Sequence, residues 1–383
     1  MVFLVPGVLA LALLAGAAST LLGACGPFTD VTDPAFCPGV LEIFFLGITT
    51  GTTPTTYDPT SSVTRLQMAA FLSREADRVL QRRSRRAALD QFWTPQDDRA
   101  LKTSDVGIGA SSVRSDGADL WVANQFSNTV TRVSGRDGSV VGTWTGATQA
   151  YQVLVAAGRI FAAGRTFPGS LHRIDPRQAP GAVTIVASNL GNFPAGIAYD
   201  GTRIWTTNDS SVSIVTPGAA LPWTVTTVTT GFTAPRGVLF DGANVWITNA
   251  DFGHLLKLDA SGGVLQTVTV VDGPQHPLFD GTNIWVPSPL PAPGSVTVVR
   301  ASNGAVLATL TGNGLNSPFT AAFDGQRVLF TNNGGNSVSL WKAADLTPIG
   351  SFTTGASSGP MGSCSDGIYF WVTLAGLNKL ARF

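Results

Sequence analysis

The stretch Asp241-Gly242-Ala243-Asn244-Val245-Trp246-Ile247-Thr248-Asn249 decides the fold of this 383-residue chain, because related copies recur on both sides of it. Each copy places Asp-Gly after an apolar run and continues into a short segment that carries an aromatic residue. The copies have their glycines at positions 117, 158, 201, 242, 281, 325 and 367. The copy at Gly158 is degenerate, with alanine in place of aspartate. Successive glycines are 39 to 44 residues apart. Regular recurrence at this spacing predicts a repeat architecture.

Each repeat is interpreted as four short strands. In the copy around Gly242, we expect strands over residues 237–240, 244–249, 254–259 and 263–268. Asp-Gly is the predicted hairpin turn between the first two strands, because glycine tolerates positive φ. Seven such units predict a mainly β chain folded as a seven-bladed β-propeller, with the recurrent tryptophans packed between blades.

The ends of the repeat region predict how the ring closes. The last copy stops at Phe383 after only three strands, and residues 99–103 match the missing fourth strand. We therefore expect an N-terminal strand to complete the last blade, which leaves no open sheet end.

Two segments, DLWVAN at 119–124 and NVWITN at 244–249, resemble the repeat of YVTN/NHL-type propellers, including YncE-like proteins. The resemblance covers about residues 99–383. It implies the fold rather than the function, because this fold hosts both binding proteins and enzymes.

Residues 28–74 follow a different pattern. Phe28-Thr29-Asp30-Val31 opens it, and Cys37 to Leu46 has helical apolar spacing. A Gly47-Ile48-Thr49-Thr50-Gly51 loop and a Tyr57-Asp58-Pro59 turn come next. Val63-Thr64-Arg65 starts a second predicted helix, with Thr64 as N-cap and with Leu66, Ala69, Ala70 and Leu72 on its buried face.

This order of motifs resembles the S-layer homology (SLH) domain, a small α-helical module that attaches proteins to envelope glycans. The resemblance implies that Arg65 contacts an acidic sugar, with Thr64 and Gly51 in the same glycan-binding set. Gln67 stands where the family has glutamate, and the chain has one copy where anchoring families have three. The alternative is that Arg65 is an ordinary exposed helix residue.

The N-terminus predicts export. Residues 1–24 are expected to be a signal peptide, since Val8 to Leu22 is apolar and rich in small residues, although no Lys or Arg precedes it. Cys25 follows Leu22-Gly23-Ala24 as in a lipobox, or it pairs with Cys37 in a disulfide; the two fates exclude each other. The expected domains are the signal peptide, an SLH-like module at 25–74, a basic helical linker at 75–98 and the propeller at 99–383.

Composition excludes some partners. The formal net charge is zero and charged residues make up 13% of the chain, so nucleic acid is not expected as a partner. The three cysteines do not have the spacing of a metal site, and no cofactor motif is present. After removal of the signal peptide, no membrane span is expected. Cys364 is expected as a small buried hydrophobe.

Two polar residues precede or begin adjacent inner strands: Arg236 in Pro235-Arg236-Gly237, and His276 in Pro274-Gln275-His276-Pro277. In a propeller these positions ring the mouth of the central channel. A paired arginine and histidine there would bind a carboxylate or act on it; the alternative is a wet polar rim. His172 and His254 are expected to be partly exposed strand residues.

Three functional hypotheses follow. The first is an exported, envelope-associated binding or scaffold protein whose SLH-like module contacts glycan and whose propeller binds a protein or small ligand. The second is an enzyme: the chain is similar to virginiamycin B lyases, seven-bladed propellers with a channel-mouth histidine, which implies His276 as its one catalytic candidate. The third is a purely structural surface-layer component. All three place the chain at the cell surface or outside the cell.

Overall fold

A computed structural model of the chain describes residues 25, 27–45, 48–65, 67–72 and 102–383. The chain divides into two compact units, Met1–Arg85 and Arg86–Phe383, and each is described here by itself. The predicted signal peptide and linker lie outside the described residues. No helix within the described ranges is long and apolar enough to cross a membrane.

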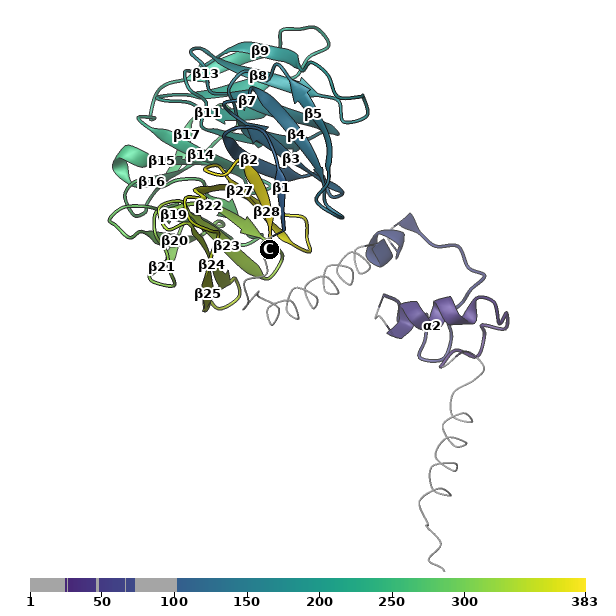
Figure 1. Cartoon of the computed structure of the whole chain (residues 1–383). Helices are drawn as coiled ribbons and strands as arrows, with labels where there is room; N and C mark the ends of the chain where they lie inside the picture. Colours follow the sequence, from purple (N-terminus) through teal and green to yellow (C-terminus); the bar gives the residue numbers. More distant parts are fainter. Residues whose placement is uncertain (1–24, 26, 46–47, 66, 73–101) are drawn as a thin grey trace, which may run out of the picture. The chain divides into compact units, whose positions relative to one another are not determined.

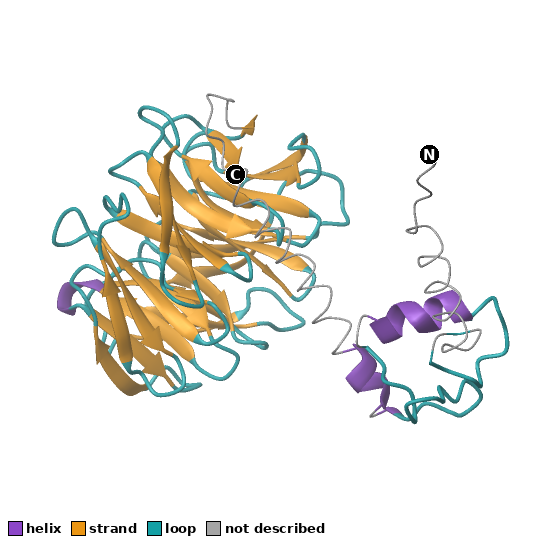
Figure 2. Ribbon diagram, turned by 90° about the horizontal axis from the view of Figure 1, so that it is seen from below, coloured by secondary structure: helices purple, strands orange, loops and turns teal. Residues whose placement is uncertain are grey.

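The second unit is a seven-bladed propeller, as the repeat predicts, with four antiparallel strands in each blade (Figures 1 and 2). Blades 1 to 3 consist of β2 (Ala110–Ser115), β3 (Asp119–Asn124), β4 (Thr129–Ser134) and β5 (Val140–Thr145); β6 (Ala150–Ala156), β7 (Arg159–Gly164), β8 (Gly169–Ile174) and β9 (Thr184–Leu190); and β10 (Gly196–Tyr199), β11 (Ile204–Thr207), β12 (Val212–Thr216) and β13 (Thr224–Val228).

The next three blades follow in chain order. Blades 4 to 6 consist of β14 (Pro235–Phe240), β15 (Val245–Asn249), β16 (His254–Leu258) and β17 (Val264–Thr269); β18 (Leu278–Phe279), β19 (Asn283–Ser288), β20 (Ser295–Arg300) and β21 (Val306–Leu310); and β22 (Pro318–Phe323), β23 (Arg327–Asn332), β24 (Ser337–Lys342) and β25 (Pro348–Thr353). A short 3₁₀ turn, η2 (Ala250–Phe252), joins β15 to β16.

Blade 7 closes the ring with both ends of the propeller. It consists of β26 (Pro360–Ser365), β27 (Phe370–Leu374) and β28 (Lys379–Arg382), with β1 (Lys102–Asp105) as its fourth strand. In Figure 1, β1 and the yellow β28 lie side by side, and Lys102 is paired with Arg382. The predicted closure is therefore confirmed for Lys102–Asp105, and residues 99–101 lie outside the described residues.

The tryptophans pack between blades. Trp121 of blade 1 is fully buried among Val153, Ile160 and Ala162 of blade 2. Trp205, Trp246, Trp285 and Trp371 are likewise buried against the following blade. Burial of these large aromatic rings between sheets contributes strongly to the apolar core of the propeller.

The Asp-Gly turn does more than reverse the chain. Gly242 has φ +96°, and the Asp241 N–H donates to the Asn244 carbonyl at 3.1 Å. The Asp241 Oδ1 accepts from the N–H groups of Ala243 and Asn244, and its Oδ2 accepts from the Trp246 indole Nε1 at 2.6 Å. The same carboxylate–indole bond recurs as Asp116–Trp121, Asp200–Trp205, Asp280–Trp285 and Asp366–Trp371. The repeated motif thus forms the turn and also holds the tryptophan by a hydrogen bond from its indole N–H.

The first unit has a small core around the opening motif. Phe28 is buried and meets the rings of Phe44 and Tyr57 at centroid distances of 5.1 and 5.6 Å. Phe44 belongs to α2 (Cys37–Phe45), which matches the first predicted helix. The Asp30 carboxylate accepts from the backbone N–H of Tyr57 at 2.8 Å, so the opening motif is tied to the distant turn.

The second predicted helix packs less than expected. Residues 67–72 are helical, but the Leu72 side chain is 63% exposed and Ala69 is also exposed. Leu66 lies outside the described residues. The buried face expected there is wrong for Leu72 and Ala69, because no described residue of this unit covers them.

Candidate functional site

The candidate site lies at the start of the inner strands. The first strands of the blades, β2, β6, β10, β14, β18, β22 and β26, each contact their neighbours and together surround the channel. Arg236 is the second residue of β14, and His276 lies two residues before β18. Leu239 is paired with Trp246, and Leu278 with Trp285. Arg236 stands three residues before Leu239 and His276 two residues before Leu278, so their places in the two inner strands differ by one residue.

Close contact between blades 4 and 5 places these two residues near one another. A side chain at Gly237 would meet the His276 Cα at 2.6 Å, so only glycine fits there. The Gly237 N–H donates to the Thr248 Oγ1 at 2.8 Å, and that hydroxyl donates to the Gln275 carbonyl at 2.7 Å. Glycine and threonine of the repeat therefore fix the spacing of the two inner strands.

Aromatic side chains complete the mouth. The His276 ring meets the Phe319 ring edge to face at 4.9 Å, and the His276 N–H donates to the Phe319 carbonyl at 3.2 Å. On the blade 2 side, the Arg165 guanidinium lies 4.7 Å from the ring centroid of Tyr151. Tyr151 is 6% exposed. The mouth thus combines cationic groups with flat apolar surfaces.

The charges around His276 share one sign. Burial, and after it the positive charges of Arg114, Arg236 and Arg165, together lower the pKa of His276 to about 3. Its imidazole is therefore neutral at physiological pH. Burial also raises the pKa of Tyr151, which stays a neutral phenol.

The three arginines lack anionic partners. Arg114 donates to the carbonyls of Val113 and Ser363 at 2.9 and 3.2 Å. Among residues 102–383, none of the three has a carboxylate within 4 Å, whereas five other cations do. Unpaired guanidinium groups in a sheltered mouth create a field that favours anions.

The remaining predicted histidines lie elsewhere. His172 is 1% exposed in β8, so the expectation of partial exposure is wrong. Its ring bonds with the Ser170 hydroxyl, and burial lowers the pKa of His172 to about 4. His254 is half-buried in β16. Cys364 is buried, and burial raises the pKa of its thiol to about 12.

The predicted residues of the first unit sit at loop and helix ends. The Gln67 N–H donates to the Thr64 Oγ1 at 3.2 Å, and the Thr64 N–H donates to the Gln67 Oε1 at 2.9 Å, which forms a capping box. Arg65 is exposed, and Gly51 has φ +78° beside Phe28. Cys25 and Cys37 are joined in a disulfide with a Cα–Cα distance of 5.4 Å.

Sequence reasoning missed Arg165 and Tyr151 at the mouth, and Arg114, which lies further along the inner strand β2. Tyr151 stands three residues before Leu154, which faces Phe161, as Arg236 stands three before Leu239. Alignment of the inner strands on these facing pairs would have found Tyr151. Arg165 follows β7, outside the inner strands, and no local pattern distinguishes it. In the described ranges, no group of three His, Cys, Asp or Glu could hold a metal ion.

Comparison with known proteins shows the fold alone. No family model matches the chain. No curated protein matches it either. A structure of streptogramin B lyase is similar, with a TM-score of 0.59 at 15% identity, over 74% of this chain and 96% of that one.

Two further solved structures are similar. Virginiamycin B lyase from Staphylococcus aureus has a TM-score of 0.61 at 15% identity, over 74% of this chain and 98% of that one. Hydrazine synthase from Kuenenia stuttgartiensis has a TM-score of 0.62 at 18% identity, over 75% and 98%. A catalytically inactive histidine-to-alanine variant of the lyase has also been solved with quinupristin. The chain therefore has a seven-bladed, YVTN-like propeller fold with virginiamycin B lyase among its structural neighbours.

Proposed function

We propose that this chain is an exported binding protein whose propeller takes a small anionic ligand at the channel mouth. The observation that carries the proposal is the convergence of Arg114, Arg165 and Arg236 on a neutral His276 without a carboxylate partner among the described residues. Like charges held together inside a channel favour an anion that neutralises them.

The surroundings also define the ligand. Arg165 and Arg236 supply donors for a carboxylate, and charge-assisted bonds of this kind are stronger than neutral ones. The half-buried Phe319 ring offers a surface for an apolar body, whereas Tyr151 is buried and its ring lies beside Arg165. A carboxylate with a flat or aliphatic body fits this combination best.

Calorimetric titration of the full chain with aliphatic and aromatic carboxylates, each beside its neutral amide, tests the proposal. We expect an acid to bind at least about tenfold more tightly than its amide, with affinity falling as salt rises. Arg236→Gln should weaken that binding, and Arg300→Gln, at an exposed site in β20, serves as the matched control. Equal binding of acids and amides would contradict the proposal.

We further propose that the first unit holds the chain at the cell envelope through Arg65. Support comes from the SLH-like order of motifs and from the capping box that fixes the helix start beside this exposed arginine. Sedimentation with purified envelope should pellet the mature chain but not Arg65→Ala or residues 99–383. If all three pellet equally, the propeller itself binds the envelope.

A second candidate is an enzyme that acts at the same mouth. The observation that favours it is the neutral imidazole of His276 beside three guanidinium groups, because such groups stabilise negative charge formed as a base removes a proton. Turnover of a substrate should be lost in His276→Ala and kept in His254→Ala. Unchanged turnover in His276→Ala would exclude this candidate.

A further inference from the structure

Six of the seven blades carry a cation near the aromatic or apolar residue of their second strand. The cation stands either two residues before that residue or opposite it on the third strand. These cations are Arg132 in blade 1, Arg159 and Arg173 in blade 2, Arg203 in blade 3, Lys257 in blade 4, Arg327 in blade 6 and Arg382 in blade 7.

Blade 5 is the exception. Asn283 stands two residues before Trp285, and Val298 stands opposite it. The Asp280 carboxylate accepts from the Trp285 indole at 2.7 Å and from the N–H groups of Thr282 and Asn283. Within residues 102–383, no cationic group lies within 4 Å of this carboxylate, as is also true of Asp116, Asp241 and Asp366. What sets blade 5 apart is that no described cation lies over its tryptophan, whereas Trp121, Trp205, Trp246 and Trp371 each have one.

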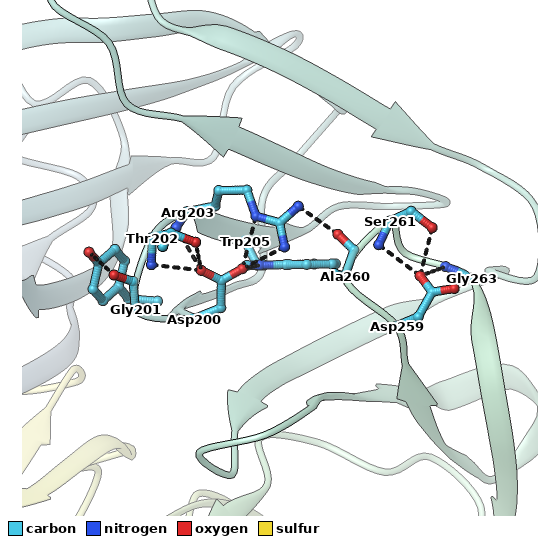
Figure 3. Close-up of polar contacts among 10 residues, drawn as sticks. Asp200, Gly201, Thr202, Arg203, Trp205, Asp259, Ala260, Ser261 and Gly263 are labelled. Atoms are coloured by element: carbon cyan, nitrogen blue, oxygen red, sulfur yellow. Dashed lines mark hydrogen bonds and ion pairs between the residues drawn. The ribbon is translucent and has the colours of Figure 1, made fainter.

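The seam between blades 3 and 4 shows what the missing cation does (Figure 3). The Arg203 guanidinium is bonded to the Asp200 carboxylate, with Nη2 at 2.9 Å, and its Nη1 donates across the seam to the Ala260 carbonyl at 2.6 Å. Asp200, Arg203 and Ala260 line a cavity of only 190 Å³. One arginine therefore neutralises the turn and spans the groove.

The seam between blades 5 and 6 is open at the same place. Asp280, Asn283 and Ala343 line a cavity of 640 Å³ there, together with Phe323. Val328 is paired with Trp341 in blade 6 as Val245 is paired with Leu258 in blade 4. Ala343 stands two residues after Trp341 and therefore corresponds to Ala260, which stands two residues after Leu258. No described residue donates to the Ala343 carbonyl, although its N–H is bonded to Gln326.

Asn283 adds an independent sign of a missing partner. Its Oδ1 is buried and has no hydrogen-bond partner in the described part of the chain. A buried acceptor without a donor is costly, so a ligand that supplies a donor gains that free energy when the Asn283 side chain turns its oxygen towards the cavity. The cavity thus offers a carboxylate and a main-chain carbonyl, and an amide oxygen once the Asn283 side chain turns, all acceptors.

We propose that this cavity, the blade 5–6 groove, binds a guanidinium group from outside the chain, in the place that Arg203 fills between blades 3 and 4. A guanidinium carries five donors in a planar fork, which suits three acceptors, and its face can lie on the Phe323 ring. Lys342 lines the same cavity. A ligand that also carries a carboxylate offsets its charge, so the ligand class is an arginine derivative with a free acid.

Titration calorimetry of the full chain with N-acetylarginine tests this site, with N-acetylcitrulline as the neutral isostere. Citrulline keeps the carboxylate and loses only the cation, so binding at the cationic channel mouth would be at least as tight for N-acetylcitrulline as for N-acetylarginine. We expect N-acetylarginine to bind at millimolar concentration and N-acetylcitrulline to bind at least about tenfold more weakly.

Two matched variants locate the binding. Asn283→Arg supplies the missing cation from blade 5 itself, so it should abolish N-acetylarginine binding and raise the melting temperature. Asn244→Arg makes the same change at the corresponding position of blade 4, where Lys257 already lies over Trp246, and should leave binding unchanged. Absence of binding to the unaltered chain, equal binding of the two compounds, or full binding by Asn283→Arg would each overturn the proposal.

Discussion

The Asp-Gly turns and the channel mouth use charge in opposite ways. At the turns, each carboxylate has donors supplied by its own blade, as Asp200 has from Thr202, Arg203 and Trp205. At the mouth, Arg165 and Arg236 come from different blades and have no carboxylate beside them in the described chain. Charge that is repeated and satisfied stabilises the ring, whereas charge that occurs once and is unsatisfied is available for a ligand.

The pKa values express the same contrast. Burial would raise the pKa of the Asp200 carboxyl, but hydrogen bonds from Trp205, Arg203 and Thr202 outweigh it and lower the pKa to about 2. His276 has burial and three cations acting together, so its neutral form is favoured. The turns therefore keep a charge that they have paired, and the mouth avoids a further positive charge.

The largest effect is expected at the turns. Trp246→Ala removes a fully buried ring between blades 4 and 5, together with its bond to Asp241. Urea unfolding should show a loss of about 3–5 kcal/mol in the free energy of unfolding. Phe126→Ala, where the side chain is 69% exposed, should change it by less than about 0.5 kcal/mol. Similar losses of unfolding free energy in both variants would contradict the expectation that the repeated motif, and not the exposed surface, stabilises the propeller.

Much of the ring could be predicted from sequence, and the reason is local. Asp-Gly followed by an aromatic strand specifies a turn, a register and a buried ring within nine residues, so seven copies fix seven blades. The N-terminal closing strand followed from the incomplete last copy. The side-chain hydrogen bond between Asp241 and Trp246 was not predicted. The pattern of a strand shows which face of the sheet a side chain lies on, but not which groups it bonds with.

The candidate site could be predicted only in part. Arg236 and His276 were found because both stand at or just before an inner strand. Arg165 follows β7 and Arg114 lies deep in β2, so their field on His276 arises from ring closure and not from any short motif. His172 was misplaced because alternation in β8 does not reveal that both faces of that strand are covered.

A smaller effect is expected from His172 in acid. Its pKa is about 4 in the folded chain and about 6.5 when unfolded, so the unfolded chain binds the proton first. The stability that the neutral ring provides is present above pH 6.5 and is lost as the pH falls towards 4, by roughly 3 kcal/mol. His172→Gln should flatten this pH dependence in urea unfolding, and His254→Gln should not. An unchanged slope in His172→Gln would show that His172 is not the group responsible.

The two shifted histidines also distinguish the mouth from the blades. An anion bound at the mouth offsets the charges of Arg165 and Arg236, so it favours the imidazolium form of His276. Nuclear magnetic resonance titration with a bound sulfonate, which stays anionic in this acid range, should raise the pKa of His276 from about 3 by about one pH unit. The pKa of His172, which burial alone lowers, should stay at about 4. Equal movement of both would indicate a general change of the ring rather than a ligand at the mouth.

The smallest expected effects are the changes in the free energy of unfolding caused by substituting Arg203 and Arg236, and only the first of these changes should be a loss. Arg203→Gln removes the ion pair with Asp200 and the bond to Ala260, and should lower the free energy of unfolding by about 1 kcal/mol. Arg236→Gln removes one of three like charges and breaks no ion pair within residues 102–383, so it should leave that free energy unchanged or raise it by up to about 0.5 kcal/mol. Urea unfolding of both variants at low salt checks the pair. A loss in Arg236→Gln as large as that in Arg203→Gln would mean that Arg236 stabilises the propeller. The charge at the mouth would then be structural, like the charge at the turns, and not available for a ligand.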